Sequence, residues 1–180
     1  IKSISGIRGT IGGHSGEGLN PLDIVKFTSA YATLIRKTTT VKSNKIVVGR
    51  YANVQDNSVL HVDDDKACIL GDYVTIGHGA IVHASTIEDN VLVGMGAIVL
   101  SGCHIGSGSI IAAGAVIKEN TVIPPNSLVV GIPARIARTD ETQIERIHNQ
   151  ALKYKHLWTV EYGMLPDAGG EEYDKNAKIV

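Results

Sequence analysis

Three histidines, His61, His78 and His83, are the side chains of this sequence best suited to metal chemistry. Imidazole is a common zinc ligand, and three protein ligands leave a fourth position open for water, as in catalytic zinc sites. A bound ion would lower the pKa of that water toward about 7 and generate hydroxide at neutral pH. A single exposed histidine is usually only a solvated side chain. A metal site is therefore predicted only if the spacing of the three histidines can bring them together.

The elements that would position these histidines are indicated by an aliphatic residue that recurs every six positions. The series is Val48, Val54, Leu60, Leu70, Ile76, Val82, Ile87, Val93, Val99, Ile105, Ile111, Ile117, Ile123 and Val129. An insertion at 63–66 and one dropped residue before Ile87 interrupt it. A six-residue period is typical of parallel β-helices and does not fit the 3.6-residue period of an amphipathic helix. Where glycine follows the aliphatic residue, as at Gly77 and Gly94, we expect a tight corner with positive φ.

The sequence therefore predicts a mainly β fold. Its centre is a left-handed parallel β-helix of hexapeptide repeats over residues 47–136, with a C-terminal α-helix within 137–165 and a short α/β segment over 1–46. The helix should begin near Asp140, where the segment from Thr142 to Glu145 fits a capping box. Polar residues 166–180 predict a loose tail. The apolar stripe that should pack on a flank of the β-helix comprises Ile144, Ile147, Ala151, Tyr154 and Trp158.

The repeat register places the three histidines on two faces of the prism. His61 and His83 each follow the inward aliphatic residue of the same face on successive coils, which stack about 4.8 Å apart. Two imidazoles at that separation can bind one ion. His78 belongs to the preceding face, so it could complete the site only for a neighbouring subunit in a threefold ring. We expect the remaining histidines to be ordinary: His14, His104, His148 and His156.

Composition excludes several classes of partner. The formal net charge is −1, and the sequence has no long run of Lys or Arg, which argues against nucleic acid or an anionic membrane. No stretch approaches the roughly 18 apolar residues of a membrane span. Cys68 and Cys103 have apolar surroundings and no paired zinc spacing, so we expect two buried free thiols. These features predict a protein of the reducing cytoplasm.

Three stretches of the sequence resemble the gamma-class carbonic anhydrases. They are Asn53–His61 (Asn-Val-Gln-Asp-Asn-Ser-Val-Leu-His), Val74–His83, and Val93–Ala97 (Val-Gly-Met-Gly-Ala). The resemblance covers about residues 47–165. It implies a homotrimer that hydrates carbon dioxide to bicarbonate with a metal-bound hydroxide. The implied ion is zinc, or alternatively iron(II) or cobalt(II), and the implied ligands are His61, His83 and a neighbour's His78.

The same resemblance implies catalytic roles for Gln55, Asn53 and Asp64. Gln55 would hydrogen-bond the metal-bound water, with Asn53 close by. Asp64 stands where some members carry an acidic proton shuttle, although acidic runs of this kind usually form a solvated loop. Family members also contain an Arg-Gly-Asp strand that serves the active site, and nothing before Val48 matches it.

Residues 1–46 resemble a different family, the phosphohexomutases of the phosphoglucosamine mutase and phosphomannomutase group. The resemblance rests on Ser3–Thr10 (Ser-Ile-Ser-Gly-Ile-Arg-Gly-Thr), on a helix predicted from Pro21, and on the stretch Lys45–Arg50. The other domains of that family are absent, so we expect no mutase activity. We interpret the chain as a fusion.

Three functions are compatible with this sequence. The leading hypothesis is a zinc-dependent lyase similar to carbonic anhydrase, impaired if the missing strand is essential. The second is an acyltransferase of the hexapeptide class, which uses acyl-CoA and a single interfacial histidine as general base. The third is a non-catalytic, metal-binding trimeric scaffold. The predicted fold cannot choose among them, because one fold can carry unrelated functions.

Overall fold

The computed structural model describes residues 2–3, 6–7, 45–163 and 170–180. The chain divides into two compact units, Ile1–Ser43 and Asn44–Val180. In the first unit, the described strands β1 (Lys2–Ser3) and β2 (Gly6–Ile7) pair in antiparallel fashion. The helix predicted from Pro21 lies outside the described residues.

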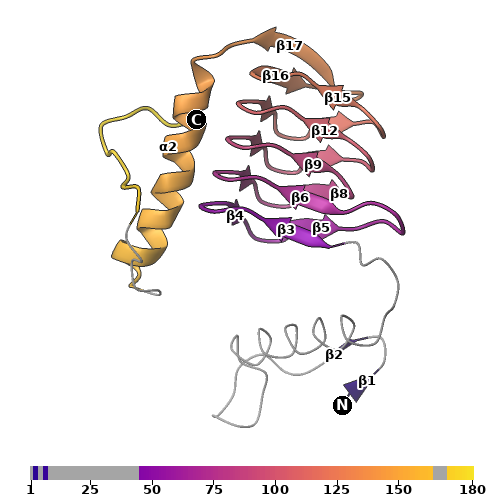
Figure 1. Ribbon diagram of the computed structural model, residues 1–180, viewed down its shortest axis with the longest axis horizontal. Coiled ribbons are helices and arrows are strands. Elements are labelled where there is room, and N and C mark those ends of the chain that lie inside the picture. The colour runs from indigo at the N-terminus through magenta and orange to yellow at the C-terminus, as the bar shows by residue number, and fades with distance from the viewer. Residues whose placement is uncertain (1, 4–5, 8–44, 164–169) are drawn as a thin grey trace. The chain divides into compact units, whose positions relative to one another are not determined.

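Strands β3 to β16 in the second unit wind into a β-helix whose three faces are parallel sheets (Figure 1). The first face carries β3 (Ile46–Val48), β6 (Cys68–Leu70), β9 (Thr86–Ile87), β12 (His104–Ile105) and β15 (Val122–Ile123). The second carries β4 (Asn53–Val54), β7 (Thr75–Ile76), β10 (Leu92–Val93), β13 (Ile110–Ile111) and β16 (Ser127–Val130). The third carries β5 (Val59–His61), β8 (Ile81–His83), β11 (Ile98–Val99) and β14 (Val116–Ile117). The predicted left-handed β-helix is confirmed.

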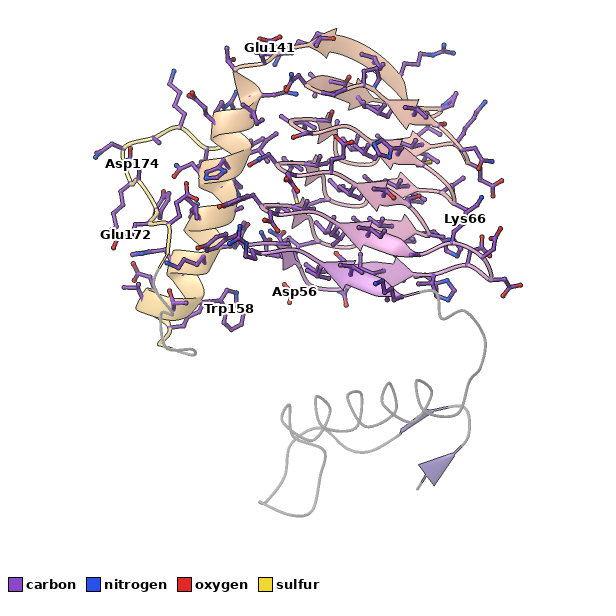
Figure 2. All side chains as sticks on the ribbon, in the orientation of Figure 1. Asp56, Lys66, Glu141, Trp158, Glu172 and Asp174 are labelled. Carbon is purple, nitrogen blue, oxygen red and sulfur yellow. The ribbon has the colours of Figure 1, made fainter. Side chains whose placement is uncertain are left out.

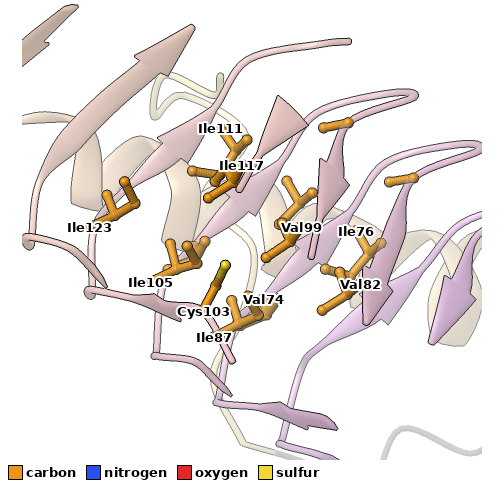
Figure 3. Packing of buried hydrophobic residues seen from close by; sticks show 14 of the residues in the cluster. Val74, Ile76, Val82, Ile87, Val99, Cys103, Ile105, Ile111, Ile117 and Ile123 are labelled. Carbon is orange, nitrogen blue, oxygen red and sulfur yellow. The ribbon is translucent and has the colours of Figure 1, made fainter. Parts of the chain in front are cut away.

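The recurring aliphatic residues fill the prism, as the six-residue period predicts. Ile76, Ile105 and Ile117 are at most 1% exposed, and they stack with the equivalent residues of neighbouring coils (Figure 3). Burying a side chain of this size stabilises the fold by about 1.5–3 kcal/mol. On the first coil, Val48 and Val54 remain 48% and 41% exposed. The first coil is therefore less completely buried than the coils that follow it.

The corner glycines have a different role from the one predicted. Positive φ occurs three residues after the aliphatic position, at glycines such as Gly79 and at asparagines such as Asn90. Glycine and asparagine are the residues that tolerate this conformation best. Gly77 and Gly94 are not among the positive-φ residues of the described chain. A Cβ added at Gly77 would lie 2.8 Å from the backbone nitrogen of Met95 on the next coil. These glycines therefore allow coils to stack closely.

The last coil is followed by a strand and a helix. Strand β17 (Arg135–Thr139) pairs antiparallel with β16. Helix α2 (Gln143–His156) then runs along the flank of the stack and continues into a π-helical turn, η1 (Leu157–Glu161) (Figure 1). The capping-box prediction is wrong, because the Thr142 hydroxyl donates to Asp140 Oδ1 at 2.6 Å and makes no cap hydrogen bond.

Helix α2 packs through only part of its predicted stripe. Ile147 and Ala151 are fully buried, whereas Trp158 is 47% exposed. Gln143 is also buried, and its Nε2 donates to the carbonyl oxygen of Gly108 at 2.7 Å. A polar residue that was not predicted to face the core thus fastens the start of the helix to the β-helix.

Residues 170–180 are held against the flank, which differs from the loose tail expected. The Tyr73 hydroxyl donates to Glu171 Oε2 at 2.7 Å, and His148 Nε2 lies 2.7 Å from Glu171 Oε1. Asn149 Nδ2 donates to the carbonyl oxygens of Asp174 and Ala177, both at 3.2 Å. His148, expected to be ordinary, is therefore part of the contact that docks the tail.

Two simpler expectations are also met in the described part of the chain. Cys68 and Cys103 are buried free thiols, as predicted, and burial raises the pKa of both. No helix among the described residues is long and apolar enough to cross a bilayer.

Candidate metal centre

His61 and His83 lie side by side on the third face. They end the neighbouring strands β5 and β8 and are register partners. Their rings stack with centroids 4.8 Å apart, and His61 Nδ1 is 3.0 Å from His83 Nε2. Two nitrogens on one tetrahedral zinc ion, with Zn–N distances of about 2.0–2.1 Å, would be ~3.3 Å apart. The observed pair is close to that separation, so both imidazoles fit as ligands of a single ion.

Two further residues, not predicted as part of the site, support this pair. Ser101 Oγ lies 2.7 Å from His83 Nδ1. Asp63, in the neighbouring loop, accepts the backbone N–H of Asp64 at 2.9 Å. The N–H of Asp64 first, and then the Ser101 hydroxyl, lower the pKa of Asp63. We call His61, His83, Ser101 and Asp63 the histidine-pair half-site.

The remaining predicted residues gather on the second face, around β4 and β7. Gln55 Nε2 donates to Asn53 Oδ1 at 3.3 Å, and Asn53 Nδ2 donates to the buried Thr75 hydroxyl at 2.8 Å. His78 follows β7, and its Nδ1 lies 3.2 Å from Asp56 Oδ2. We call Asn53, Gln55, Asp56 and His78 the amide half-site.

The two half-sites are separate within one chain. Among the described residues, no three His, Cys, Asp or Glu side chains gather closely enough to hold a metal ion. In Figure 2, Asp56 of the amide half-site and Lys66, from the loop that carries Asp63, lie apart on the β-helix. The described residues of a single chain therefore do not complete a site with three histidine ligands, and the contribution of His78 from another subunit stays a prediction.

Asp64 lies in the insertion loop beside the histidine-pair half-site. Asp64 is exposed, and its backbone N–H donates a hydrogen bond to Asp63 Oδ1. Its predicted role as a proton shuttle stays a prediction. The acidic residue of this loop whose pKa the Ser101 hydroxyl lowers is Asp63.

Comparison with known proteins places the chain in a family. Residues 84–119 match the family model for the bacterial transferase hexapeptide (six repeats). The chain is 41% identical to "Gamma carbonic anhydrase 1, mitochondrial" of Arabidopsis thaliana, over 63% of this chain and 44% of that relative. It is 52% identical to "Probable carbonic anhydrase" of Methanocaldococcus jannaschii, over 63% of this chain and 72% of the relative. The chain belongs to the gamma-class carbonic anhydrase-like hexapeptide-repeat proteins.

The chain is also similar to a protein described as a transferase. The crystal structure of a hexapeptide transferase family protein from Anaplasma phagocytophilum is 36% identical, with a TM-score of 0.60, over 67% of this chain and 69% of that one. None of these comparisons shows the predicted phosphohexomutase resemblance of residues 1–46. That resemblance falls mostly on residues outside the described part and stays a prediction.

Proposed function

We propose that this gamma-class carbonic anhydrase-like protein is a metalloenzyme that reversibly hydrates carbon dioxide between the subunits of a homotrimer. The observation that supports this most is the pairing of His61 and His83, whose facing nitrogens are 3.0 Å apart. The 52% identity to a relative named as a carbonic anhydrase favours carbon dioxide as the substrate. We propose that His78 of the neighbouring subunit is the third ligand and that the ion is zinc, with iron(II) or cobalt(II) as alternatives. A cytoplasmic location completes the proposal.

The amide half-site has an orientation suited to hold a water molecule. When bound, a divalent ion supplies a nucleophile at neutral pH by lowering the pKa of water toward about 7. Gln55 uses its Nε2 as a donor to Asn53, whose own Nδ2 is a donor to Thr75. Gln55 Oε1 therefore remains as an acceptor that can orient the attacking water. Asp64 is exposed, which is compatible with the proposed role of passing a proton to solvent.

Acyl transfer from acyl-CoA is the second candidate. The match of residues 84–119 to the transferase hexapeptide model and the similarity to the Anaplasma phagocytophilum protein favour it. Such a reaction needs only one histidine as general base, so it does not account for the stacked pairing of His61 and His83. Dependence of turnover on acyl-CoA separates the two functions. Metal binding without turnover of either substrate would instead indicate a non-catalytic scaffold.

The test is the rate of carbon dioxide hydration by zinc-, iron(II)- and cobalt(II)-loaded protein, measured by stopped flow with a pH indicator. We expect hydration above background for the intact chain and a fall to background for His83→Ala, because that variant lacks a proposed ligand. His104→Ala is the matched control. His104 lies on the first face and pairs with Glu88 at 2.6 Å, so its loss should leave the rate unchanged. Hydration by His83→Ala at the parent rate would contradict the proposal.

A further inference from the structure

The C-terminal tail runs back along α2 (Figure 1), and Glu171 fastens its start. The Glu171 carboxylate accepts a hydrogen bond from the Tyr73 hydroxyl at 2.7 Å, and it lies 2.7 Å from His148 Nε2. The backbone N–H of Glu171 donates to the Tyr51 hydroxyl at 3.2 Å, and Lys155 Nζ donates to its carbonyl oxygen at 3.2 Å. The two tyrosines precede β4 and β7, whereas His148 and Lys155 belong to α2. Glu171 therefore joins the helix to the first two coils of the β-helix.

Further along, the tail makes more hydrogen bonds with α2. Asn149 Nδ2 donates to the carbonyl oxygen of Ala177 at 3.2 Å, and Arg146 Nη2 donates to that of Ile179 at 3.3 Å. Asn149 is only 6% exposed, and a buried amide needs hydrogen-bond partners. The tail thus satisfies a polar group of the helix that would otherwise be costly to bury.

Helix α2 in turn covers the strand on which the amide half-site is built. Ile76 points into the prism, so Thr75, its neighbour in β7, points outward. Thr75 is nevertheless only 1% exposed, because α2 packs against β7. The covered Thr75 hydroxyl is the partner of Asn53 Nδ2 at 2.8 Å. A hydrogen bond shielded from water in this way is stronger than an exposed one.

We propose that the tail is a strap that holds α2 on β7 and thereby keeps the side chains of the amide half-site in fixed positions. The route runs from Glu171 through α2 to Thr75, then to Asn53 and to Gln55, whose Nε2 is 3.3 Å from Asn53 Oδ1. If α2 lifts from β7, water can compete for the Thr75 hydroxyl, and the two amides lose their anchor. The inference goes beyond the proposed function, and its test requires neither a bound ion nor turnover.

Two exchange measurements on the full-length, metal-free protein test the strap. Hydrogen exchange by mass spectrometry reports on the backbone amides of α2, and water-exchange NMR reports on the side-chain amide of Asn53. We expect Glu171→Ala to speed both about 10-fold, the effect of losing one hydrogen bond to a charged group. Glu172→Ala is the matched control, because it removes the same charge from the next position, and it should match the parent.

Unchanged exchange in Glu171→Ala would overturn the inference. A faster α2 with an unchanged Asn53 amide would overturn it as well, because the helix would then have no influence on the half-site. Tyr73→Phe removes one donor to Glu171 and keeps the ring, so it should shift both measurements in the same direction. This variant keeps the test decisive if Glu171→Ala does not fold.

A double-mutant cycle tests the route through the strand. In Thr75→Val the Asn53 amide has already lost its partner, so adding Glu171→Ala should not speed its exchange further, although α2 should still respond. Additive effects of the two substitutions on the Asn53 amide would overturn the route through Thr75. A parent that binds no metal would overturn the proposed function alone, since none of these measurements involves an ion.

Discussion

At the scale of the residue, the candidate site depends on strand register. His61 and His83 pair because β5 and β8 align residue for residue. A slip of one residue would turn one imidazole away from the other, since side chains alternate between the two faces of a strand. The six-residue period fixes this register in the sequence, and that is why the pair could be predicted without any structure.

We predict a specific effect for the glutamine of the amide half-site. Gln55→Met keeps the approximate size of the side chain but removes the Oε1 acceptor that we propose to orient water. Hydration should fall about 100-fold in kcat/KM, the typical cost of misplacing a reacting group, while metal content stays at the parent level. Stopped-flow rates and metal analysis on the same sample check this. Loss of the metal, or an unchanged rate, would show that Gln55 does not have this role.

Residues outside the repeat could not be predicted in the same way. Asp63 belongs to the insertion at 63–66, whose path is not periodic, and its position relative to Ser101 depends on where that loop turns. Ser101 itself stands two residues after Val99, and a small polar residue at a corner of the repeat gives no sequence signal of a functional role. Only the stacking of β11 on β8 shows that it lies beside His83.

At the scale of the element, the β-helix could be predicted because each hexad repeats the same local rule. The start of α2 and the docking of residues 170–180 could not, since both depend on single contacts between distant residues. The Thr142 hydroxyl bonds Asp140, and Glu171 finds Tyr73, which lies 98 positions away in the sequence. Polar residues in a segment with Gly-Gly indicated a loose tail, but they do not reveal which partners such residues will meet.

The docked tail should respond to acid. The Tyr73 hydroxyl first, and then His148, lower the pKa of Glu171 from its ordinary value of 4.5. A carboxyl group with a lowered pKa in the folded state stabilises that state above 4.5, and the contribution disappears as the pH falls through the lowered pKa. The contact of Glu171 with the flank should therefore persist at neutral pH and weaken below about pH 4.5.

An NMR titration of the Glu171 carboxyl group measures this directly. We expect a pKa below 4.5 in the parent and a rise toward 4.5 in Tyr73→Phe, which removes the largest cause of the shift. Tyr162→Phe is the matched control, because Tyr162 is exposed and its ring contacts Trp158. The same Glu171 titration in Tyr73→Phe as in the parent would show that the hydroxyl does not hold the tail.

At the scale of the whole molecule, the two half-sites lie on different faces of the prism. The histidine-pair half-site is on the third face and the amide half-site on the second, so the described residues of one chain do not assemble the three-histidine site. In the threefold ring that we propose, the third face of each subunit would lie against the second face of its neighbour. We therefore propose that assembly and metal binding are coupled.

The most direct test is metal content per chain of the purified protein, measured together with its mass in solution. We predict about one divalent ion per chain in a trimer, because each interface would supply one set of three histidines. The His78→Ala variant should lose the ion, since it removes the ligand contributed by the neighbour. A metal-free trimer, or full metal content in His78→Ala, would contradict the interfacial site formed by His61, His78 and His83.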